Sequence, residues 1–231
     1  MSKRQQIEDM YAEMSKCTKC PRLVETRKQV VRGRGNPDAS RIVLVGEGPG
    51  PEENKDGEAF VGKSGRKLDS MLAKLGDPKK SDFIISEDDV YIFNSVSCWP
   101  TQLNRLVDPP QLETAKPTAE EIANCRPWLE RLIRIIDPMA LILAGEYACL
   151  SFGLKGAMTG LQGKMVDVQV QGINRKINYC AMPIYHPAFL LRSADKPQLE
   201  EITQRALRAL VDRAWACIRI SKGMSPMPVG E

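Results

Sequence analysis

Short runs of apolar, largely β-branched residues alternate with helical patterns along this chain, and the alternation limits the possible folds more than any other feature. Four such runs, bounded by Gly, Pro or Asn, cover residues 42–45, 90–93, 141–144 and 177–184. They are typical of buried strands. Strands that alternate with helices predict a three-layer α/β/α fold around a central, mostly parallel, four-stranded sheet. Functional residues are then expected just after each strand, at the carboxyl ends.

Helical patterns occupy the segments between these runs. Thr118 and Glu121 form a capping box ahead of a helix whose apolar face continues to residue 136, and Pro127 is expected to kink or divide it. A second helix is predicted from residue 65, stopping at Gly76, and a third over residues 198–219.

Length and composition favour one domain, 1–222, followed by a Pro-, Gly- and Met-rich tail, 223–231, that is expected to be disordered. The apolar content of 42% and charged content of 27% are ordinary for a globular protein. The longest apolar stretch, 138–145, is too short to cross a bilayer, so no membrane association is expected. A domain of this size is expected to be a monomer.

Seven cysteines and one histidine narrow the chemistry. The odd number of cysteines and an N-terminus without an apolar run predict a reducing, cytoplasmic setting without disulfides. The single His186 excludes any site that needs two histidines. Four thiols, Cys17, Cys20, Cys98 and Cys125, would suit either zinc or an iron-sulfur cluster. The other three are expected in the core: Cys149, Cys180 and Cys217.

The net charge of +4 conceals an uneven distribution. Basic residues dominate 17–41 and 205–222, whereas 47–58 is acidic. Such runs are ordinarily solvated faces, but basic segments also permit contact with nucleic acid.

The strand ends carry the candidate site. The first is followed by the Gly- and Pro-rich run 46–54, which is neither a Walker loop nor a dinucleotide fingerprint. Asn94 follows the second run, and its amide can either read a pyrimidine edge or terminate a strand. His186 follows the fourth apolar run. A lone histidine is often structural, but a position at the carboxyl end of a predicted strand favours a functional role. Phe60 suits either base stacking or the core.

Together these residues resemble the iron-sulfur (family-four) branch of the uracil-DNA glycosylases, over roughly residues 17–192. The resemblance rests on eight elements in order: Cys17-x-x-Cys20, Val31-Arg32-Gly33-Arg34-Gly35, Gly46-Glu47-Gly48-Pro49-Gly50-Pro51-Glu52-Glu53, Gly57-Glu58-Ala59-Phe60-Val61-Gly62, Asn94-x-x-x-Cys98, Cys125-x-Pro127-x-Leu129, Ala144-Gly145 and His186-Pro187-Ala188.

The resemblance implies a uracil-DNA glycosylase-like fold and an enzyme that binds single- or double-stranded DNA and removes uracil by base flipping, for base excision repair. It implies a [4Fe-4S] cluster held by Cys17, Cys20, Cys98 and Cys125. The implied catalytic residues are His186 and Asn94. The resemblance places Glu53 on the base pocket, and we take Glu53 as the third catalytic residue because it is the nearest candidate for orienting water. The implied base-binding residues are Gly46, Glu47, Gly48, Gly50, Phe60, Asn94 and His186. A wedge into the duplex is expected from Phe189, Leu190 and Leu191.

Two departures from the family pattern are Gly48, where Ala is usual, and Asn54, where Asp is usual. Gly48 is expected to enlarge the pocket by a methyl group, and the water-activating Asp found there in the best-known branch is missing. The Cys98–Cys125 segment is also longer than usual, with the excess expected in 103–117. These departures leave open an inactive DNA-binding relative and a glycosylase for another altered base. The acidic run 47–58 leaves open a third alternative, a zinc-stabilised hydrolase.

Overall fold

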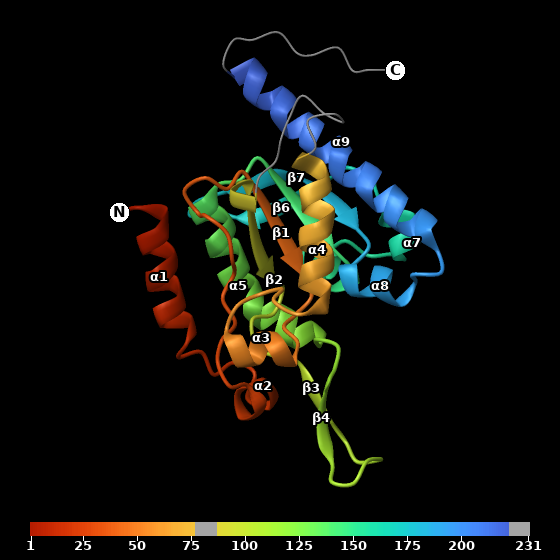
Figure 1. Ribbon diagram of the computed structural model, residues 1–231. Coiled ribbons are helices and arrows are strands. Elements are labelled where there is room, and N and C mark those ends of the chain that lie inside the picture. Colours follow the sequence, from red (N-terminus) through yellow and green to blue (C-terminus); the bar gives the residue numbers. More distant parts are fainter. Residues whose placement is uncertain (77–86, 222–231) are drawn as a thin grey trace.

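The computed structural model describes residues 1–76 and 87–221 (Figure 1). The tail predicted to be disordered, 223–231, and the side chain of Cys217 lie outside the described parts.

A five-stranded sheet forms the centre of the molecule (Figure 1). Its first four strands are parallel, and the fifth is antiparallel to its neighbour. The predicted, mostly parallel sheet is therefore confirmed, but it has five strands rather than four. The added strand buries only alternate residues, so it lacks the continuous apolar run that marks the other four. The order is β2 (Val90–Asn94), β1 (Ile42–Gly46), β5 (Ala140–Ala144), β7 (Lys176–Ile184) and β6 (Val166–Gln171).

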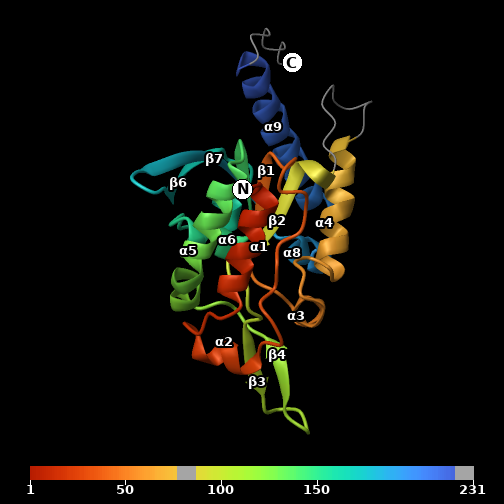
Figure 2. The same ribbon diagram turned by 90° about the vertical axis from the view of Figure 1, so that its left-hand side faces the viewer.

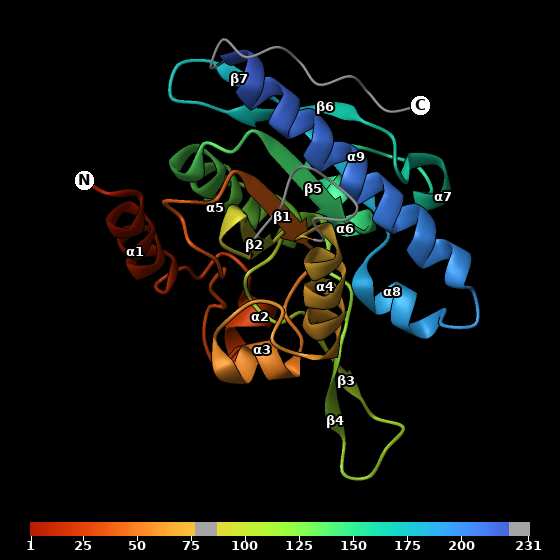
Figure 3. The same ribbon diagram turned by 45° about the horizontal axis from the view of Figure 1, so that its top comes forward.

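Helices cover both faces of the sheet, which confirms the three-layer architecture (Figures 2 and 3). On one face lie α4 (Lys63–Ala73), α8 (Pro187–Arg192) and α9 (Pro197–Ser221). On the other lie α1 (Lys3–Met14), α5 (Ala119–Ile136) and α6 (Glu146–Ser151). The remaining helices are α2 (Pro21–Thr26), α3 (Pro51–Asp56), α7 (Met158–Leu161) and the short turns η1 (Lys74–Gly76) and η2 (Glu87–Asp89).

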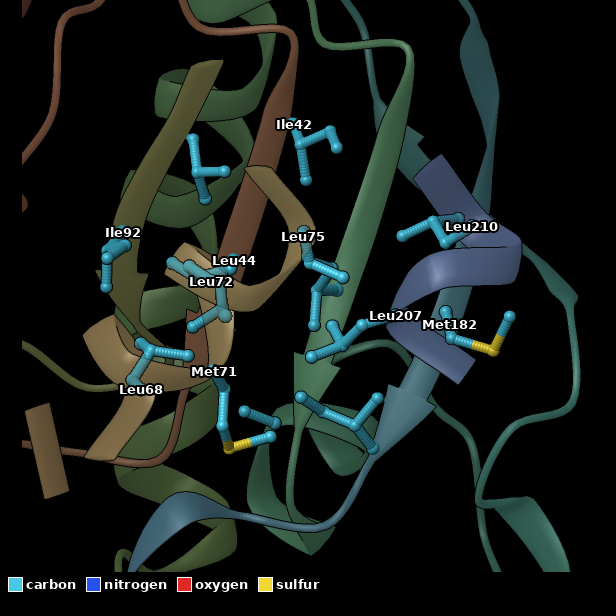
Figure 4. Close-up of a cluster of buried hydrophobic side chains, with 14 of the residues drawn as sticks. Ile42, Leu44, Leu68, Met71, Leu72, Leu75, Ile92, Met182, Leu207 and Leu210 are labelled. Carbon is cyan, nitrogen blue, oxygen red and sulfur yellow. The ribbon is translucent and has the colours of Figure 1, made fainter. Parts of the chain in front are cut away.

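Alternation along each strand divides the core into two layers. Leu44 belongs to the layer under α4 and α9, and its neighbours Val43 and Val45 to the layer under α1 and α5. Figure 4 shows the first layer, where α4 and α9 side chains meet the strands: Leu68, Met71 and Leu72 of α4 and Leu207 and Leu210 of α9 lie near Ile42, Leu44, Ile92 and Met182.

The predicted helix boundaries are close to the observed ones. Thr118 Oγ1 accepts from the Glu121 backbone N–H, and Glu121 Oε2 accepts from the Thr118 N–H, so the capping box at α5 is confirmed. Pro127 does not divide α5, because buried residues before and after it, Cys125 and Leu129, hold both halves on the core. The 3-10 turn η1 ends the second predicted helix at Gly76.

A two-stranded antiparallel hairpin, β3 (Thr101–Asn104) and β4 (Gln111–Thr114), projects from the body beyond the carboxyl ends of the parallel strands (Figures 1 and 2). It accounts for the extra length expected in 103–117. Its base is anchored to α2, because Thr101 Oγ1 donates to Thr26 Oγ1 (2.9 Å) and the Arg22 guanidinium donates to the Thr101 carbonyl.

Within the described residues, every helix is too short or too polar to cross a membrane.

Candidate active site

A cavity of about 900 Å³ opens beyond the carboxyl ends of β1, β2, β5 and β7, where the topology predicts a site. Most of the predicted site residues line it. Gly46 is the exception: it is buried at the end of β1 and does not line the cavity. Those on the wall are Glu47, Gly48, Gly50, Glu53, Phe60, Asn94 and His186.

Glu53, a buried carboxylate in the first turn of α3, fixes the loop after β1 through two hydrogen bonds. Its Oε2 accepts from the backbone N–H of Gly50 (2.9 Å) and its Oε1 from that of Gly62 (2.8 Å). Glu53 therefore ties the start of α3 to the start of α4 and fixes one side of the cavity. Each oxygen keeps lone pairs for a further donor.

Asn94 and Phe60 meet over Gly46. Asn94 pairs with Gly46 in the β1–β2 register, and a Cβ on Gly46 would come within 2.5 Å of both Asn94 Oδ1 and the Phe60 ring. Only glycine at position 46 allows this approach. The Oδ1 atom of Asn94 is buried without a hydrogen-bond partner, although the side chain lines the cavity. A buried acceptor without a donor is costly, so it is suited to a ligand that brings one.

Phe60 has an unusual backbone conformation, with φ of 57° in the left-handed region. Its carbonyl oxygen would lie 1.6 Å from any Cβ on Gly65, so the first turn of α4 packs directly on the Phe60 backbone. The ring lies beside the imidazole of His186, with centroids 5.8 Å apart. These contacts hold an aromatic face against the cavity next to the one histidine.

His186 caps the N-terminus of α8, where its Nδ1 accepts from the Ala188 backbone N–H at 3.1 Å. Burial lowers the pKa of His186 to about 4, and the positive charges of Lys116 and Arg192 act in the same direction. The imidazole is therefore neutral at physiological pH. Because Nδ1 is an acceptor, the proton of the neutral ring is on Nε2, which leaves Nε2 as a donor.

Lys116 and Tyr147 complete the rim, and neither is among the predicted site residues. Lys116 Nζ bonds both carboxylate oxygens of Glu47, at 3.0 and 3.1 Å, and lies 5.1 Å from the centre of the Tyr147 ring. Burial raises the pKa of Glu47 although the Lys116 hydrogen bond opposes the rise. The strand-end rule applied to β5 would have found Tyr147; Lys116 follows the hairpin, and no sequence signal points to it.

The two departures from the family pattern have local explanations. A Cβ on Gly48 would lie 3.1 Å from Pro100 Cγ and 3.3 Å from Pro100 Cδ, so a methyl group there would press on Pro100. This contact gives glycine a local reason at position 48, and the expectation that Gly48 enlarges the pocket stays a prediction. Asn54 is buried, and its Oδ1 accepts from the Lys28 backbone N–H at 2.8 Å. Its amide holds the chain before the first strand.

The proposed wedge residues separate into two groups. Phe189 and Leu191 are 37% and 42% exposed, and Phe189 lies on the cavity wall against Tyr185. Leu190 is buried in the core layer under α4, because α8 turns its side chain inward. The burial of Leu190 therefore contradicts the wedge prediction for that residue, and the wedge role of Phe189 and Leu191 stays a prediction.

Cys17, Cys20, Cys98 and Cys125 gather at one end of the molecule, around α2 and the start of α5. Cys98, Cys20 and Cys17 all lie close enough to Cys125 for their charges to help raise its pKa. Two donors already point at sulfur: Arg27 Nη1 at Cys98 Sγ (3.3 Å) and Asn124 Nδ2 at Cys20 Sγ (3.6 Å). Over residues 1–76 and 87–221, no three side chains converge in the geometry of a single-ion site.

Burial raises the pKa of the thiols of Cys20 and Cys98, and that of Cys125 to about 12. Thiols in such surroundings ionise only when a cationic partner offsets the cost, as iron or zinc does. An all-sulfur donor set with N–H donors aimed at two sulfurs fits an iron-sulfur group. Of the predicted core cysteines, Cys149 is buried and Cys180 is half-buried.

Known proteins resemble this chain over most of its length. The family model described as the uracil DNA glycosylase superfamily matches residues 32–211. A type-4 uracil-DNA glycosylase of Thermotoga maritima is 38% identical over 84% of this chain and 88% of its own length. A type-4 uracil-DNA glycosylase of Archaeoglobus fulgidus is 34% identical over 84% of this chain and 86% of its own length. A type-5 uracil-DNA glycosylase of Pyrobaculum aerophilum is 28% identical over 89% of this chain and 92% of its own length.

The family model spans all five strands of the sheet and both the Asn94 and His186 walls of the cavity. The similarity therefore covers the fold and the site together, and the chain belongs to the uracil DNA glycosylase superfamily.

Proposed function

We propose that this protein is a uracil-DNA glycosylase, which hydrolyses the bond between uracil and deoxyribose in DNA and leaves an abasic site for repair. The observation that carries the proposal is the pair of polar groups in one cavity. Asn94 has a buried, unpartnered acceptor, and His186 is a neutral donor through Nε2. The family to which the chain belongs supports the same activity.

Recognition follows from complementary hydrogen bonds. Uracil presents an N3–H donor between two carbonyl acceptors. Asn94 Oδ1 would accept from N3–H while the amide N–H donates to O4, a bidentate pairing that the adenine and cytosine edges do not satisfy in the same way. Phe60 supplies a face for the ring to stack on. The base must leave the DNA stack to reach this depth, which costs a few kcal/mol.

Cleavage breaks the C1′–N1 bond, and the electron pair departs with N1, so negative charge spreads over the uracil ring. The Nε2–H of His186 would donate to uracil O2, where this charge collects, and a donor that strengthens only in the transition state accelerates the reaction. Lys116 and Arg192, which lie near enough to His186 to lower its pKa, add positive charge on the same side.

Water completes the reaction by bonding to C1′ and releasing a proton to the departing base or to solvent. Glu53 is the residue we assign to orient this water, because its carboxylate lies on the cavity wall and keeps lone pairs beyond its two backbone bonds. Phe189 and Leu191 would fill the gap that the flipped nucleotide leaves in the duplex.

We further propose that Cys17, Cys20, Cys98 and Cys125 hold a [4Fe-4S] cluster. Such a cluster binds each thiolate through a different iron, so its ligands surround a centre larger than one ion. The cluster would join the segment before α2 to Cys98 and to α5. We expect a structural role for it, in a cytoplasmic, monomeric protein.

The activity is tested by an excision panel on single strands that carry uracil, hydroxymethyluracil, thymine, hypoxanthine or xanthine. Release of uracil in preference to the others is the expected result. Binding of uracil-containing DNA with no release of any base would instead identify an inactive relative, and preferential release of another base would reassign the specificity.

The cluster is tested by the absorption spectrum and by iron and zinc analysis of protein purified without oxygen. About four irons per chain and a broad visible band are expected for the parent, and a loss of both for Cys98→Ser. Cys149→Ser is the matched control, because Cys149 is equally buried but lies away from the four thiols. One zinc per chain in a colourless parent would refute the cluster.

A further inference from the structure

The β3–β4 hairpin carries a stripe of exposed apolar side chains. Leu103 and Leu112 are 50% and 43% exposed, and at the tip Leu106 is 97% exposed and Val107 39%. All four are among the large apolar side chains exposed to solvent in the described residues, and they lie on one short hairpin. Apolar residues grouped in this way mark an interaction surface more often than scattered ones do.

The stripe begins at the active site. Leu103 faces Leu112 across the hairpin, and Thr101 faces Thr114. Because side chains two residues apart lie on the same face of a strand, the face that carries Thr114 also carries the two leucines. Thr114 lines the cavity, and Lys116 follows it on the rim. The apolar face therefore begins beside a residue of the cavity wall. The hairpin that carries it runs outward from the body (Figures 1 and 2).

The hairpin is built to keep its shape. The Leu106 backbone N–H donates to Asn104 Oδ1 at 2.8 Å, and the Asn104 amide bonds the Glu113 carboxylate across the strands. At the base, Trp99 Nε1 donates to Thr114 Oγ1 at 3.0 Å. Together with the anchor on α2, these bonds hold the hairpin backbone in place before any partner arrives, which reduces the entropy cost of binding.

We propose that this stripe is a second DNA-contacting surface, which packs on the bases that flank the target nucleotide. The inference rests on the proposed function. A strand that sends one nucleotide into the cavity must carry its neighbours across the rim, and the hairpin is on that rim. Bases beside a flipped nucleotide expose apolar faces, which aliphatic side chains cover.

The charge pattern favours bases over phosphates as the contact. Residues 101–114 hold one basic and two acidic side chains, Arg105, Asp108 and Glu113. Glu113 lies next to Leu112 in the strand, so its carboxylate is on the opposite face from the stripe. A surface without excess positive charge adds affinity that depends little on salt, because it releases few counterions.

The test compares Leu106→Ser with Ile173→Ser. Ile173 is 91% exposed in the turn between β6 and β7, away from the hairpin, and is therefore a matched control for loss of an exposed aliphatic side chain. Affinity is measured by fluorescence anisotropy with a 30-nucleotide strand that carries an abasic-site analogue, and kcat/KM with a 30-nucleotide and a trinucleotide uracil substrate.

Leu106→Ser is expected to weaken binding and lower kcat/KM on the 30-nucleotide strand about tenfold, as for a leucine that becomes half-buried. The trinucleotide values should not change, because Leu106 lies at the far end of the hairpin from the cavity and one base on either side of the uracil does not reach it. The slope of log Kd against log salt should not change either, and Ile173→Ser should match the parent throughout. Parent-like behaviour of Leu106→Ser on the long strand would overturn the inference. So would a parent dimer that Leu106→Ser converts to a monomer, because the stripe would then bind a second copy.

Failure of the proposed function is distinguishable from failure of this inference. A parent that releases no uracil but binds the long strand, with binding weakened by Leu106→Ser, would refute the glycosylase activity and support the surface. A parent that binds no DNA would refute the surface.

Discussion

The Nδ1 atom of His186 accepts a hydrogen bond from the backbone N–H of Ala188, 3.1 Å away. This bond uses the imidazole as a helix cap and at the same time selects the tautomer, since the only other ring nitrogen must then carry the proton. The first turn of α8 thereby prepares a donor at the carboxyl end of β7, before substrate binds.

Replacement of His186 by alanine should lower kcat by about 10²–10³ because it removes one donor to the developing negative charge. KM should change little, since the bond strengthens mainly in the transition state. Single-turnover excision of uracil from a short strand measures the effect. A variant as fast as the parent would remove His186 from the proposed chemistry.

His186 should also make stability depend on pH. The pKa falls from 6.5 in the unfolded chain to about 4 in the folded protein. As the pH drops from 6.5 to 4, the unfolded chain takes up a proton that the folded protein does not, so the free energy of unfolding decreases, by at most about 3 kcal/mol. Urea unfolding of the parent and of His186→Ala at pH 4, 5.5 and 7 tests this, because the difference between them should grow with pH only over that window.

Asn94→Ala should lower kcat/KM for uracil substrates about 10²-fold, through loss of the bidentate contact. The midpoint of thermal unfolding without DNA should not fall, because the substitution also removes a buried acceptor that has no partner. Excision assays and calorimetry on the same preparation measure both quantities. A large drop in the midpoint with unchanged kcat/KM would make Asn94 a structural residue.

Glu53→Gln should reduce both stability and rate. The amide cannot accept from the N–H groups of both Gly50 and Gly62, and a buried donor left unpaired costs about 1–3 kcal/mol. A water-orienting carboxylate predicts, in addition, a fall in kcat of about tenfold at a temperature where the variant is fully folded. A loss of stability alone would leave Glu53 as a clamp of the loop.

Gly48→Ala should destabilise the protein by about 1 kcal/mol, because its Cβ presses on Pro100. Pro100→Ala in the same chain should relieve the strain, so the double-mutant cycle should show a coupling energy of similar size. Gly160→Ala serves as the control, since a Cβ there meets nothing within 4 Å. Additive effects of the two substitutions would show that the side chains do not press on each other.

The sequence predicts the parallel strands and long helices well because each has a continuous periodic pattern. Leu129, Leu132 and Ile133 mark α5, and the Gly76 stop of the α4 region is equally clear. The edge strand β6 is not predictable from a continuous apolar run because it buries only alternate residues. The hairpin is not predictable in this way because β4 buries none of its residues.

The site shows the same division. Asn94 and His186 are predictable because Asn94 ends β2 and His186 lies just after β7, and the carboxyl ends of both strands lie at the cavity. Lys116 is not, since its position on the rim depends on where the hairpin returns to the body. The inward turn of Leu190 and the contact between Pro100 and Gly48 also depend on tertiary packing, which no local pattern records.

Phe60 is the feature with the widest consequence. Its left-handed backbone is a conformation that glycine adopts without strain, whereas a bulky side chain costs about 1 kcal/mol or more. The buried ring offsets this strain, because its removal would leave a cavity in the core layer under α4 and α9 at a cost of about 3–5 kcal/mol. Selection for folding alone should therefore keep Phe60 together with Gly65, whose Cβ would meet the Phe60 carbonyl, even in a population that no longer needs repair.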